Sequence, residues 1–302
     1  MNDRFTLTDF LNRYSTDDKC LEEIKNIRWG EFIPCKKCGK DTPHYKITGR
    51  MQYACQFCGT HVAPLAGTIF EKSTTPLTSW FYAMFLMINT RAGVSAKTLQ
   101  RELGVTYKTA WRMFHQIRKL MADDSFMFTD GVVEIDETYV GGKAKNRMKK
   151  WYQGEIQKEA IMGIVQREGK VYLKHVEGTG KWAVLEQVQS KIDPRVRVIT
   201  DQYGSYTQLK KHGYAHNVIN HNKHYVMGDI HTQNIENVWS HLKRGIFGVY
   251  RHVSKKYLQA YADEFSFRYN NRKNPHKMFE ILLKEVMQVK MISASQLALV
   301  VR

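Results

Sequence analysis

The stretch Gly131-Val-Val-Glu-Ile-Asp-Glu-Thr-Tyr-Val140 decides the fold of the longer part of this chain. Its β-branched and apolar residues predict a buried strand, and Asp136 lies within it. A second apolar run, residues 196–200, predicts another strand, and Asp201 follows it directly. Strands and helices then mix along residues 130–290, which is typical of an α/β domain with a mixed sheet flanked by helices.

The order of the expected elements supports this fold class. The strands are expected at residues 132–139, 160–166, 171–176, 196–200 and 216–219. The helices are expected near residues 182–191, 206–211, the segment around Glu236, 255–270 and 276–289. Three strands therefore precede the first helix, and strands and helices alternate after it.

Glu236 completes a set of three carboxylates. Its segment, residues 232–243, carries apolar residues at helical spacing, so Glu236 is expected on a helix. Two aspartates on strands and a glutamate on a helix can meet only by folding, and together they repel one another unless a cation neutralises them. Three oxygen ligands with open positions suit Mg²⁺, which keeps water or substrate phosphates. The set predicts two-metal phosphoryl transfer.

Other acidic residues compete for this role, and an aspartate that ends a strand is often only a turn residue. The competing acids are Glu134, Glu137, Asp193, Asp229 and Glu264. Glu134 alternates with Asp136 and is therefore expected on the same face of the strand, whereas Glu137 is expected on the opposite face.

Four of the five cysteines form two pairs, and this pattern predicts a metal site. The pairs are Cys35-x-x-Cys38 and Cys55-x-x-Cys58, and each is followed by a glycine that permits a tight turn. In a chain without a secretory signal, such spacing indicates zinc rather than disulfides. Four thiolates close the coordination shell, so the Zn²⁺ is expected to be structural. The fifth cysteine, Cys20, is expected to be a small packing residue.

The composition points to a polyanionic partner. The chain of 302 residues has a formal net charge of +17 and a pI of about 9.6. Nucleic acid is the commonest polyanion that such a charge serves, although a basic protein without this partner is the alternative. No apolar run reaches 18 residues and no secretory signal is visible, so we expect no membrane span and a cytoplasmic, nucleoid-associated protein.

Three segments are candidates for contact with DNA. Within residues 76–122, Ser95 and Thr106 can cap two helices around Gly104, which predicts a helix-turn-helix, with an ordinary helical hairpin as the alternative. The start of the second helix offers Tyr107, Lys108 and Arg112. Residues 141–150 carry Lys143, Lys145 and Arg147, as a phosphate-binding arm or a solvated loop. Residues 243–277 mix basic and aromatic side chains and begin with Lys243 and Arg244.

Taken together, these motifs resemble a known family. The cysteine pairs and the predicted helix-turn-helix are followed by three motifs in a fixed order: Ile-Asp-Glu-Thr-Tyr-Val-Gly-Gly-Lys at 135–143, Thr-Asp-Gln-Tyr-Gly-Ser-Tyr at 200–206 and His-Thr-Gln-Asn-Ile-Glu-Asn-Val-Trp-Ser-His-Leu-Lys-Arg-Gly at 231–245. Residues 265–272 also look like this family. The chain resembles, over roughly residues 20–285, prokaryotic insertion-sequence transposases with an N-terminal zinc ribbon and an RNase H-like DDE catalytic domain.

The resemblance implies a domain order and a reaction. Residues 1–30 would be an N-terminal helical segment, 31–70 the zinc ribbon, 76–122 the helix-turn-helix module and 130–290 the RNase H-like catalytic domain with its C-terminal helices. Such enzymes bind terminal inverted repeats and catalyse DNA cleavage and strand transfer with two Mg²⁺ ions, which Mn²⁺ can replace. They act as homodimers or higher oligomers on DNA. A DNA-binding regulator with an inactive catalytic domain and a nuclease without joining activity are the alternatives.

The same resemblance assigns roles to single residues. Asp136, Asp201 and Glu236 match the DDE triad, and His231 matches a histidine that precedes the catalytic helix. A surface histidine at a helix start is the alternative for His231. Lys243 lies two helical turns after Glu236 and would contact DNA beside the metal site.

Overall fold

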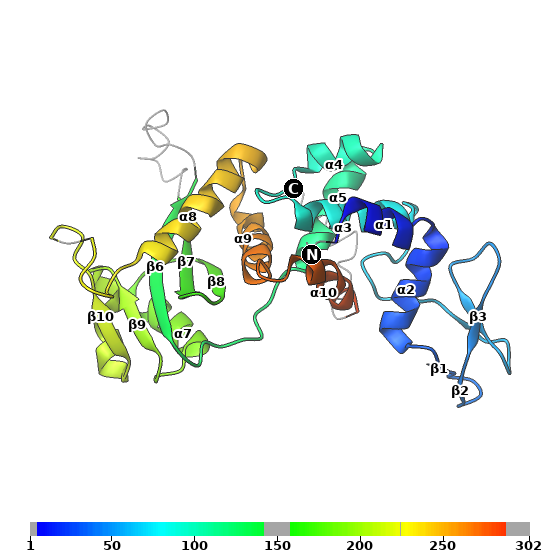
Figure 1. Ribbon diagram of the computed structural model, residues 1–302, viewed down its shortest axis with the longest axis horizontal. Coiled ribbons are helices and arrows are strands. Elements are labelled where there is room, and N and C mark those ends of the chain that lie inside the picture. Colours follow the sequence, from blue (N-terminus) through cyan, green and yellow to red (C-terminus); the bar gives the residue numbers. More distant parts are fainter. Residues whose placement is uncertain (1–4, 142–157, 224, 288–302) are drawn as a thin grey trace. The chain divides into compact units, whose positions relative to one another are not determined.

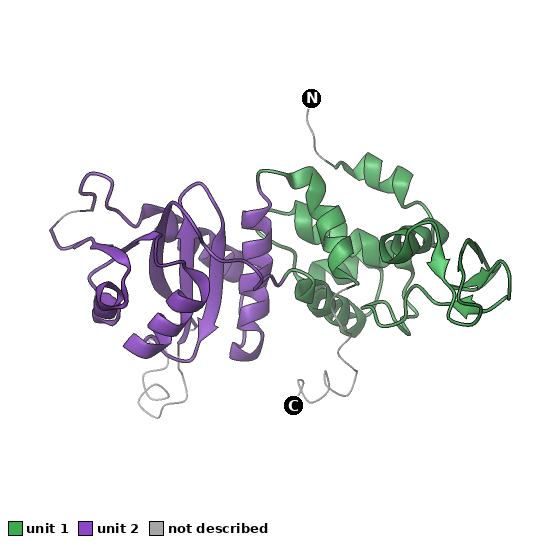
Figure 2. Ribbon diagram, turned by 90° about the horizontal axis from the view of Figure 1, so that it is seen from below, with its two compact units in different colours: residues 1–121, 273–302 green, residues 122–272 purple. Residues whose placement is uncertain are grey.

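The computed structural model describes residues 5–141, 158–223 and 225–287. The chain divides into two units, which Figure 2 colours separately. Unit 1 comprises residues 1–121 and 273–302, and unit 2 comprises residues 122–272. Among the described ranges, no helix combines the length and the apolar character needed to cross a membrane.

Unit 1 starts with helices α1 (Leu7–Arg13) and α2 (Asp17–Trp29). Thr6 and Thr16 cap them, since each hydroxyl accepts a hydrogen bond from a backbone amide in the first turn. The buried face of α2 includes Cys20, which is completely inaccessible to solvent. Cys20 is therefore a packing residue, as its sequence context predicts.

The cysteine-rich segment forms two small antiparallel sheets. Their strands are β1 (Ile33–Pro34) and β2 (Asp41–Thr42) in one sheet, and β3 (His44–Lys46), β4 (Tyr53–Cys55) and β5 (His61–Val62) in the other. Such short strands bury little apolar surface, so a segment of this size needs a further staple such as a metal.

Three further helices of unit 1 are α3 (Leu77–Asn89), α4 (Ala96–Leu103) and α5 (Tyr107–Lys119). The predicted caps are present: the Ser95 hydroxyl accepts from the Thr98 amide at 3.0 Å, and the Thr106 hydroxyl accepts from the Thr109 amide at 3.2 Å. Gly104 ends α4 in the left-handed conformation, with φ of 63°. Both helices therefore begin at the predicted caps, and α4 ends at Gly104 as expected, whereas α5 ends at Lys119, two residues before the expected Met121.

The last described helix, α10 (Met278–Glu285), belongs to unit 1, although the sequence places it in the segment 130–290 together with the catalytic elements. Phe279 is 1% exposed and its ring lies 5.3–5.9 Å from those of Phe10, Tyr14 and Phe81. Aromatic packing thus binds α10 to helices that begin the chain, and unit 2 ends at residue 272.

Unit 2 is built on a mixed five-stranded sheet. Its strands are β6 (Val132–Val140), β7 (Glu159–Gln166), β8 (Val171–Val176), β9 (Arg197–Thr200) and β10 (Ala215–Val218). They lie in the order β10-β9-β6-β7-β8. The pairs β6–β7 and β7–β8 are antiparallel, whereas β9 runs parallel to both β6 and β10. This mixed topology is that of the RNase H-like fold that the family resemblance implies.

Helices cover both faces of this sheet (Figure 1). One face packs against α7 (Lys181–Lys191) and the 3-10 helix Gly204–His212 through a core that includes Val133, Ile135 and Tyr206. The other face packs against α8 (Gln233–Gly245) and α9 (Lys255–Asn270). Odd-numbered residues of β6 therefore face α7, and even-numbered residues face α8.

Candidate functional site

The register of two parallel strands brings Asp136 and Asp201 together. In the β6–β9 pair, Ile135 is aligned with Thr200, so the residues that follow, Asp136 and Asp201, are neighbours on adjacent strands. Neighbouring strands lie about 4.8 Å apart. Asp201 stands directly after the end of β9, where its Oδ1 accepts a hydrogen bond from the Tyr203 amide at 2.9 Å.

Helix α8 carries Glu236 to the same edge of the sheet. Its apolar residues Ile235 and Trp239 pack in the core on the even-numbered face of β6. The indole Nε1 of Trp239 donates a hydrogen bond to Asp136 Oδ2 at 2.8 Å. Glu236 lies between these two buried residues on the helix and is itself exposed. The sequence-predicted carboxylates thus come from β6, the end of β9 and the first turns of α8.

Trp239 fits against Asp136 because β7 has no side chain at the facing position. Gly163 is the β7 partner of Asp136. A Cβ atom at Gly163 would lie 2.5 Å from Trp239 Cη2 and 2.9 Å from Ile235 Cδ1. Real Cβ atoms do not approach other atoms this closely, so the glycine permits α8 to lie directly on the sheet.

Burial and neighbouring carboxylates raise the pKa of two acids on β6. The pKa of Asp136 is raised to about 6, first by burial and further by the nearby charges of Asp201 and Glu236. Burial also raises the pKa of Glu137 to about 7, with smaller contributions from Asp136 and Asp201. Glu137 lies on the opposite face, as predicted, where it accepts a hydrogen bond from the Tyr206 hydroxyl. A cation at this edge would relieve the repulsion.

The side chain of Glu236 has neighbours that sequence reasoning missed. Its Oε1 accepts a hydrogen bond from the Thr232 hydroxyl at 3.0 Å. His221, from the loop after β10, places Nε2 at 3.0 Å from Thr232 Oγ1 and 3.6 Å from Glu236 Oε1. Nothing in the local pattern distinguishes His221 from other surface histidines, because its position depends on the return of a loop to the start of α8.

The residues at this edge carry the type of ligand atom that a hard divalent cation prefers. Asp136, Asp201 and Glu236 offer oxygen ligands, which Mg²⁺ and Mn²⁺ prefer, and no cationic side chain of the described residues forms an ion pair with Asp136 or Asp201. Glu236 is 52% exposed at its side chain, so the site opens to solvent and to a substrate.

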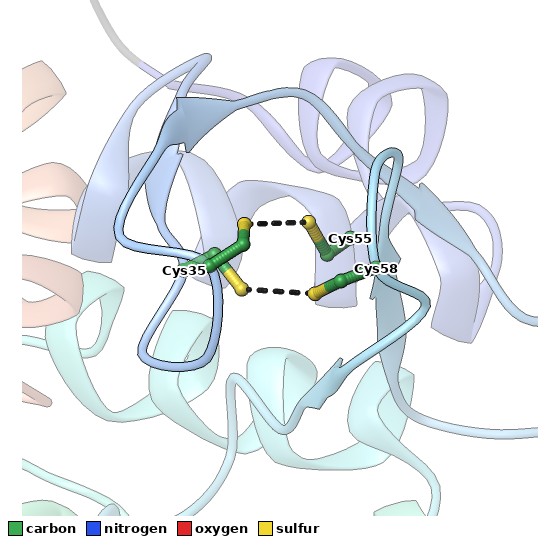
Figure 3. Close-up of side chains that lie close together, drawn as sticks. Cys35, Cys55 and Cys58 are labelled. Atoms are coloured by element: carbon green, nitrogen blue, oxygen red, sulfur yellow. Dashed lines mark hydrogen bonds between the residues drawn. The ribbon is translucent and has the colours of Figure 1, made fainter.

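The four paired cysteines form a second candidate metal site, in unit 1. Their sulfur atoms lie within 4.8 Å of one another, with Cys35 Sγ at 3.5 Å from Cys58 Sγ and Cys38 Sγ at 3.8 Å from Cys55 Sγ. Figure 3 shows the thiols of Cys35, Cys55 and Cys58 pointing toward a common centre. A tetrahedral ion with Zn–S bonds of about 2.3 Å has sulfurs about 3.8 Å apart. The cluster therefore fits Zn²⁺.

Matching turns hold the two cysteine pairs. Gly39 and Gly59 both have φ of 68°, a left-handed conformation that strains other residues. Their amides donate to the carbonyls of Cys35 and Cys55 at 2.9 and 3.0 Å. Hydrogen bonds with the side chain and backbone of Thr60 lower the pKa of Cys58 to about 6, which favours its thiolate form.

Comparison with known proteins finds a matching domain family for each of the two units. Residues 128–270 match the model of an ISXO2-like transposase domain, and residues 15–61 match a transposase zinc-ribbon domain. Together the two matches cover more than half of the chain. The chain belongs to the transposases that join these two domains. The family thus accounts for both the four-cysteine cluster of unit 1 and the mixed sheet of unit 2.

A curated relative supports the same assignment. This transposase is 25% identical to a protein described as an "Uncharacterized protein in transposable element ISH50" of Halobacterium salinarum. The similarity covers 88% of this chain and 95% of the relative.

The structure places the predicted DNA-contacting residues of the transposase in different environments. Tyr107 and Lys108 are exposed at the start of α5, whereas Arg112 is half-buried. Lys243 is half-buried near the end of α8, and Arg244 is exposed and donates to the Ser240 hydroxyl at 3.0 Å. The basic residues expected on a phosphate-binding arm, Lys143, Lys145 and Arg147, lie outside the described residues.

His231 lies at the start of α8, but its ring is turned toward the sheet rather than toward Glu236. Its Nδ1 is 3.4 Å from Glu134 Oε1 and also 3.4 Å from the Gln233 amide. Only one of these contacts can be a hydrogen bond in a given tautomer, because Nδ1 either donates or accepts.

Proposed function

We propose that this transposase binds the terminal inverted repeats of an insertion sequence and catalyses both cleavage and strand transfer at one site. The single observation that carries the proposal is the meeting of Asp136 and Asp201 through the β6–β9 register, beside a helix that carries Glu236. The charges of Asp201 and Glu236 contribute to the raised pKa of Asp136, which supports a common metal site.

The three carboxylates have separable tasks in this proposal. Asp136 would be the most tightly held ligand, because its Oδ2 is fixed by Trp239 and leaves Oδ1 for a metal. Asp201 would supply a ligand from the end of β9, and Glu236 would supply one from α8. When bound, two Mg²⁺ ions, or Mn²⁺ in their place, would activate the attacking oxygen and stabilise the leaving 3′ oxygen.

The same residues would serve two successive reactions. Water is the nucleophile when the strand is cut at the element end, and the 3′ hydroxyl that this cut produces is the nucleophile on target DNA. Both are in-line displacements at phosphorus, so the chain needs only to exchange one oxygen nucleophile for another. The open position beside Glu236 leaves room for this exchange.

Recognition of the element ends would belong to unit 1. The exposed residues Tyr107 and Lys108 begin a capped helix, which is the part of a helix-turn-helix that usually contacts base edges. Lys243 would contact DNA beside the carboxylates, since it follows Glu236 by two helical turns. The formal charge of +17 suits a polyanionic partner.

The test compares wild type with Asp136→Asn, Asp201→Asn and Glu236→Gln on a labelled element end. Each variant keeps size and shape but loses one negative charge of the metal site. We expect DNA binding to remain while Mg²⁺-dependent cleavage and joining fall by at least about 100-fold. Asp193→Asn is the matched control, because Asp193 precedes β9 at the end opposite Asp201 and pairs with Arg195 at 2.9 Å.

The outcomes separate three functions. Wild-type protein that binds the end but does not cut it with Mg²⁺ or Mn²⁺ would point to a DNA-binding regulator. Cutting without joining would point to a nuclease. Loss of cleavage in Asp193→Asn to the same extent as in Asp136→Asn would remove the assignment of the triad.

A further inference from the structure

Glu134 is a buried carboxylate to which neither the proposed chemistry nor the family motif gives a role. It lies on β6, two residues before Asp136 and on the same face of the strand. Its side chain is completely inaccessible to solvent. A carboxylate in such a position is costly unless every oxygen has hydrogen-bond partners. Both oxygens of Glu134 have them.

The first set of partners is the start of α8. Glu134 Oε2 accepts hydrogen bonds from the backbone amides of Asn234 at 2.8 Å and Ile235 at 3.1 Å. Glu134 Oε1 accepts from the side-chain amide of Asn234 at 2.8 Å. The first amides of a helix have no partners within the helix, and the helix dipole favours a negative charge there.

Glu134 takes the place of a local cap. Thr232 occupies the N-cap position of α8, but its side chain makes no capping hydrogen bond. Its hydroxyl instead donates to Glu236 Oε1. Glu134, on the central strand and 100 positions before Asn234, therefore caps the helix in place of Thr232.

The second set of partners holds Glu134 itself in place. Arg167, which directly follows β7, donates from Nε to Glu134 Oε1 at 2.9 Å. Another nitrogen of the same guanidinium, Nη2, donates to the backbone carbonyl of His231 at 3.1 Å. One arginine thus connects the carboxylate to the loop that leads into α8. With these bonds made, Glu134 has no oxygen directed to a metal.

We propose that Glu134 is a positioning residue that fixes the first turn of α8, and hence Glu236, relative to Asp136. The helix is attached to β6 at two points on either side of Glu236: Glu134 holds Asn234 and Ile235, and Asp136 holds Trp239. The two acids on one face of β6 therefore divide the work, one as ligand and one as anchor. The inference rests on the proposed function.

The test is Glu134→Gln in the full-length protein. Glutamine keeps the size of the side chain, but its NH₂ group must face either the amides of α8 or the guanidinium of Arg167, so one donor meets another. We expect amide hydrogen exchange in residues 233–236 to become several-fold faster. The Mn²⁺ constant, which is the Mn²⁺ concentration that gives half-maximal cleavage, should rise about 10- to 100-fold. This is the effect expected when a residue that orients a metal ligand is replaced.

Two comparisons distinguish positioning from general stability. Excess Mn²⁺ should restore part of the cleavage rate of Glu134→Gln but not of Glu236→Gln, and binding of the element end should stay within about twofold. Glu264→Gln is the matched control: Glu264 is also completely buried and pairs with Arg268 and the Tyr250 hydroxyl, but it lies on α9. It should lower thermal stability without changing the Mn²⁺ dependence.

Defined results would overturn the inference. An unchanged Mn²⁺ constant in Glu134→Gln, or an equal rise in Glu264→Gln, would show that Glu134 only contributes to stability. Unchanged exchange in residues 233–236 would show that it does not anchor the helix. If wild type neither binds Mn²⁺ nor cleaves, the proposed function fails, whereas faster exchange in Glu134→Gln would still support the anchor.

Discussion

Asp136 has two properties that suit its proposed role as a metal ligand, a fixed orientation and an unfavourable negative charge. Trp239 fixes one oxygen, and burial beside Asp201 and Glu236 raises its pKa from 3.8 to about 6. A carboxylate that is unfavourable without a cation gains more from binding one. In the metal-free protein, ionisation of Asp136 therefore lowers the stability of the folded state.

The raised pKa predicts a pH-dependent stabilisation by metal. Without metal, folded Asp136 keeps its proton up to about pH 6, whereas the unfolded chain loses it near 3.8. This group's contribution to stability is therefore greatest below 3.8 and is lost as pH rises to 6. Mn²⁺ replaces the proton, so the increase in Tm that it causes should grow from pH 5 to pH 7.

Asp263 provides the control for this measurement. Its pKa is also raised to about 6 by burial, but it lies on α9 and accepts a hydrogen bond from Gln259. Asp263→Asn should keep the pH dependence of the Mn²⁺ effect, and Asp136→Asn should abolish it. A Tm increase that is the same at pH 5 and pH 7 in wild type would contradict the prediction.

At the scale of elements, helix starts are fixed by distant carboxylates in both units. Helix α3 has no side-chain cap of its own, and Asp17 Oδ1 of α2 accepts from the amide and the hydroxyl of Thr78, both at 2.9 Å. Glu134 does the same for α8 from β6. Capping across elements stabilises each helix only in its correct tertiary position.

The close contact between α8 and β7 predicts the effect of a single methyl group. In Gly163→Ala the new Cβ would overlap Trp239 and Ile235, so α8 must shift and the Trp239–Asp136 hydrogen bond must weaken. We expect the free energy of unfolding to fall by about 1–3 kcal/mol. The Mn²⁺ constant for cleavage should rise as well.

Gly178→Ala is the control for this substitution, because no atom lies within 4 Å of the added Cβ. Thermal melting followed by circular dichroism gives the stability of both variants, and a metal titration of cleavage gives the second readout. Equal stability of Gly163→Ala and Gly178→Ala would show that α8 adjusts without cost.

Loss of a zinc ligand is expected to unfold the zinc ribbon and to leave unit 2 folded. Cys38→Ser removes one of four ligands, and the short strands β1 to β5 bury too little to fold without the ion. We expect elemental analysis to find one zinc per wild-type chain and a large loss in the variant. Cys20→Ala should retain zinc, because Cys20 is buried away from the cluster. Limited proteolysis of Cys38→Ser should cut the zinc ribbon first and leave unit 2 intact.

At the scale of the whole molecule, the net positive charge is expected to govern the strength of DNA binding. A net charge of +17 makes binding to DNA a release of counterions. The logarithm of the binding constant should fall linearly with the logarithm of salt, with a slope of about −0.9 for each phosphate neutralised. Lys108→Ala and Arg244→Ala, at two exposed positions, should each reduce the slope by about 1. Filter binding between 50 and 300 mM salt measures this slope. A DNA-binding constant that does not change with salt concentration would contradict the prediction.

The sequence by itself determined the local features of this protein. The glycine after each cysteine pair, the serine and threonine caps of α4 and α5, and the strand at Val132–Val140 all follow from neighbouring residues. Such features depend on backbone conformation and hydrophobic period, which a few consecutive residues specify. The family resemblance added the expected assignment of Asp136, Asp201 and Glu236 to a catalytic triad.

Only the tertiary structure decided which partners each acid contacts. Glu134 and Asp136 share a strand, a face and a charge, so no local pattern separates the anchor from the proposed ligand. The placement of α8 separates them, through bonds between residues about 100 positions apart. The positions of His221 beside Glu236 and of Phe279 within unit 1 likewise could not be predicted from the local sequence. Contacts of this kind arise from the packing of whole elements, and that packing is a property of the folded chain.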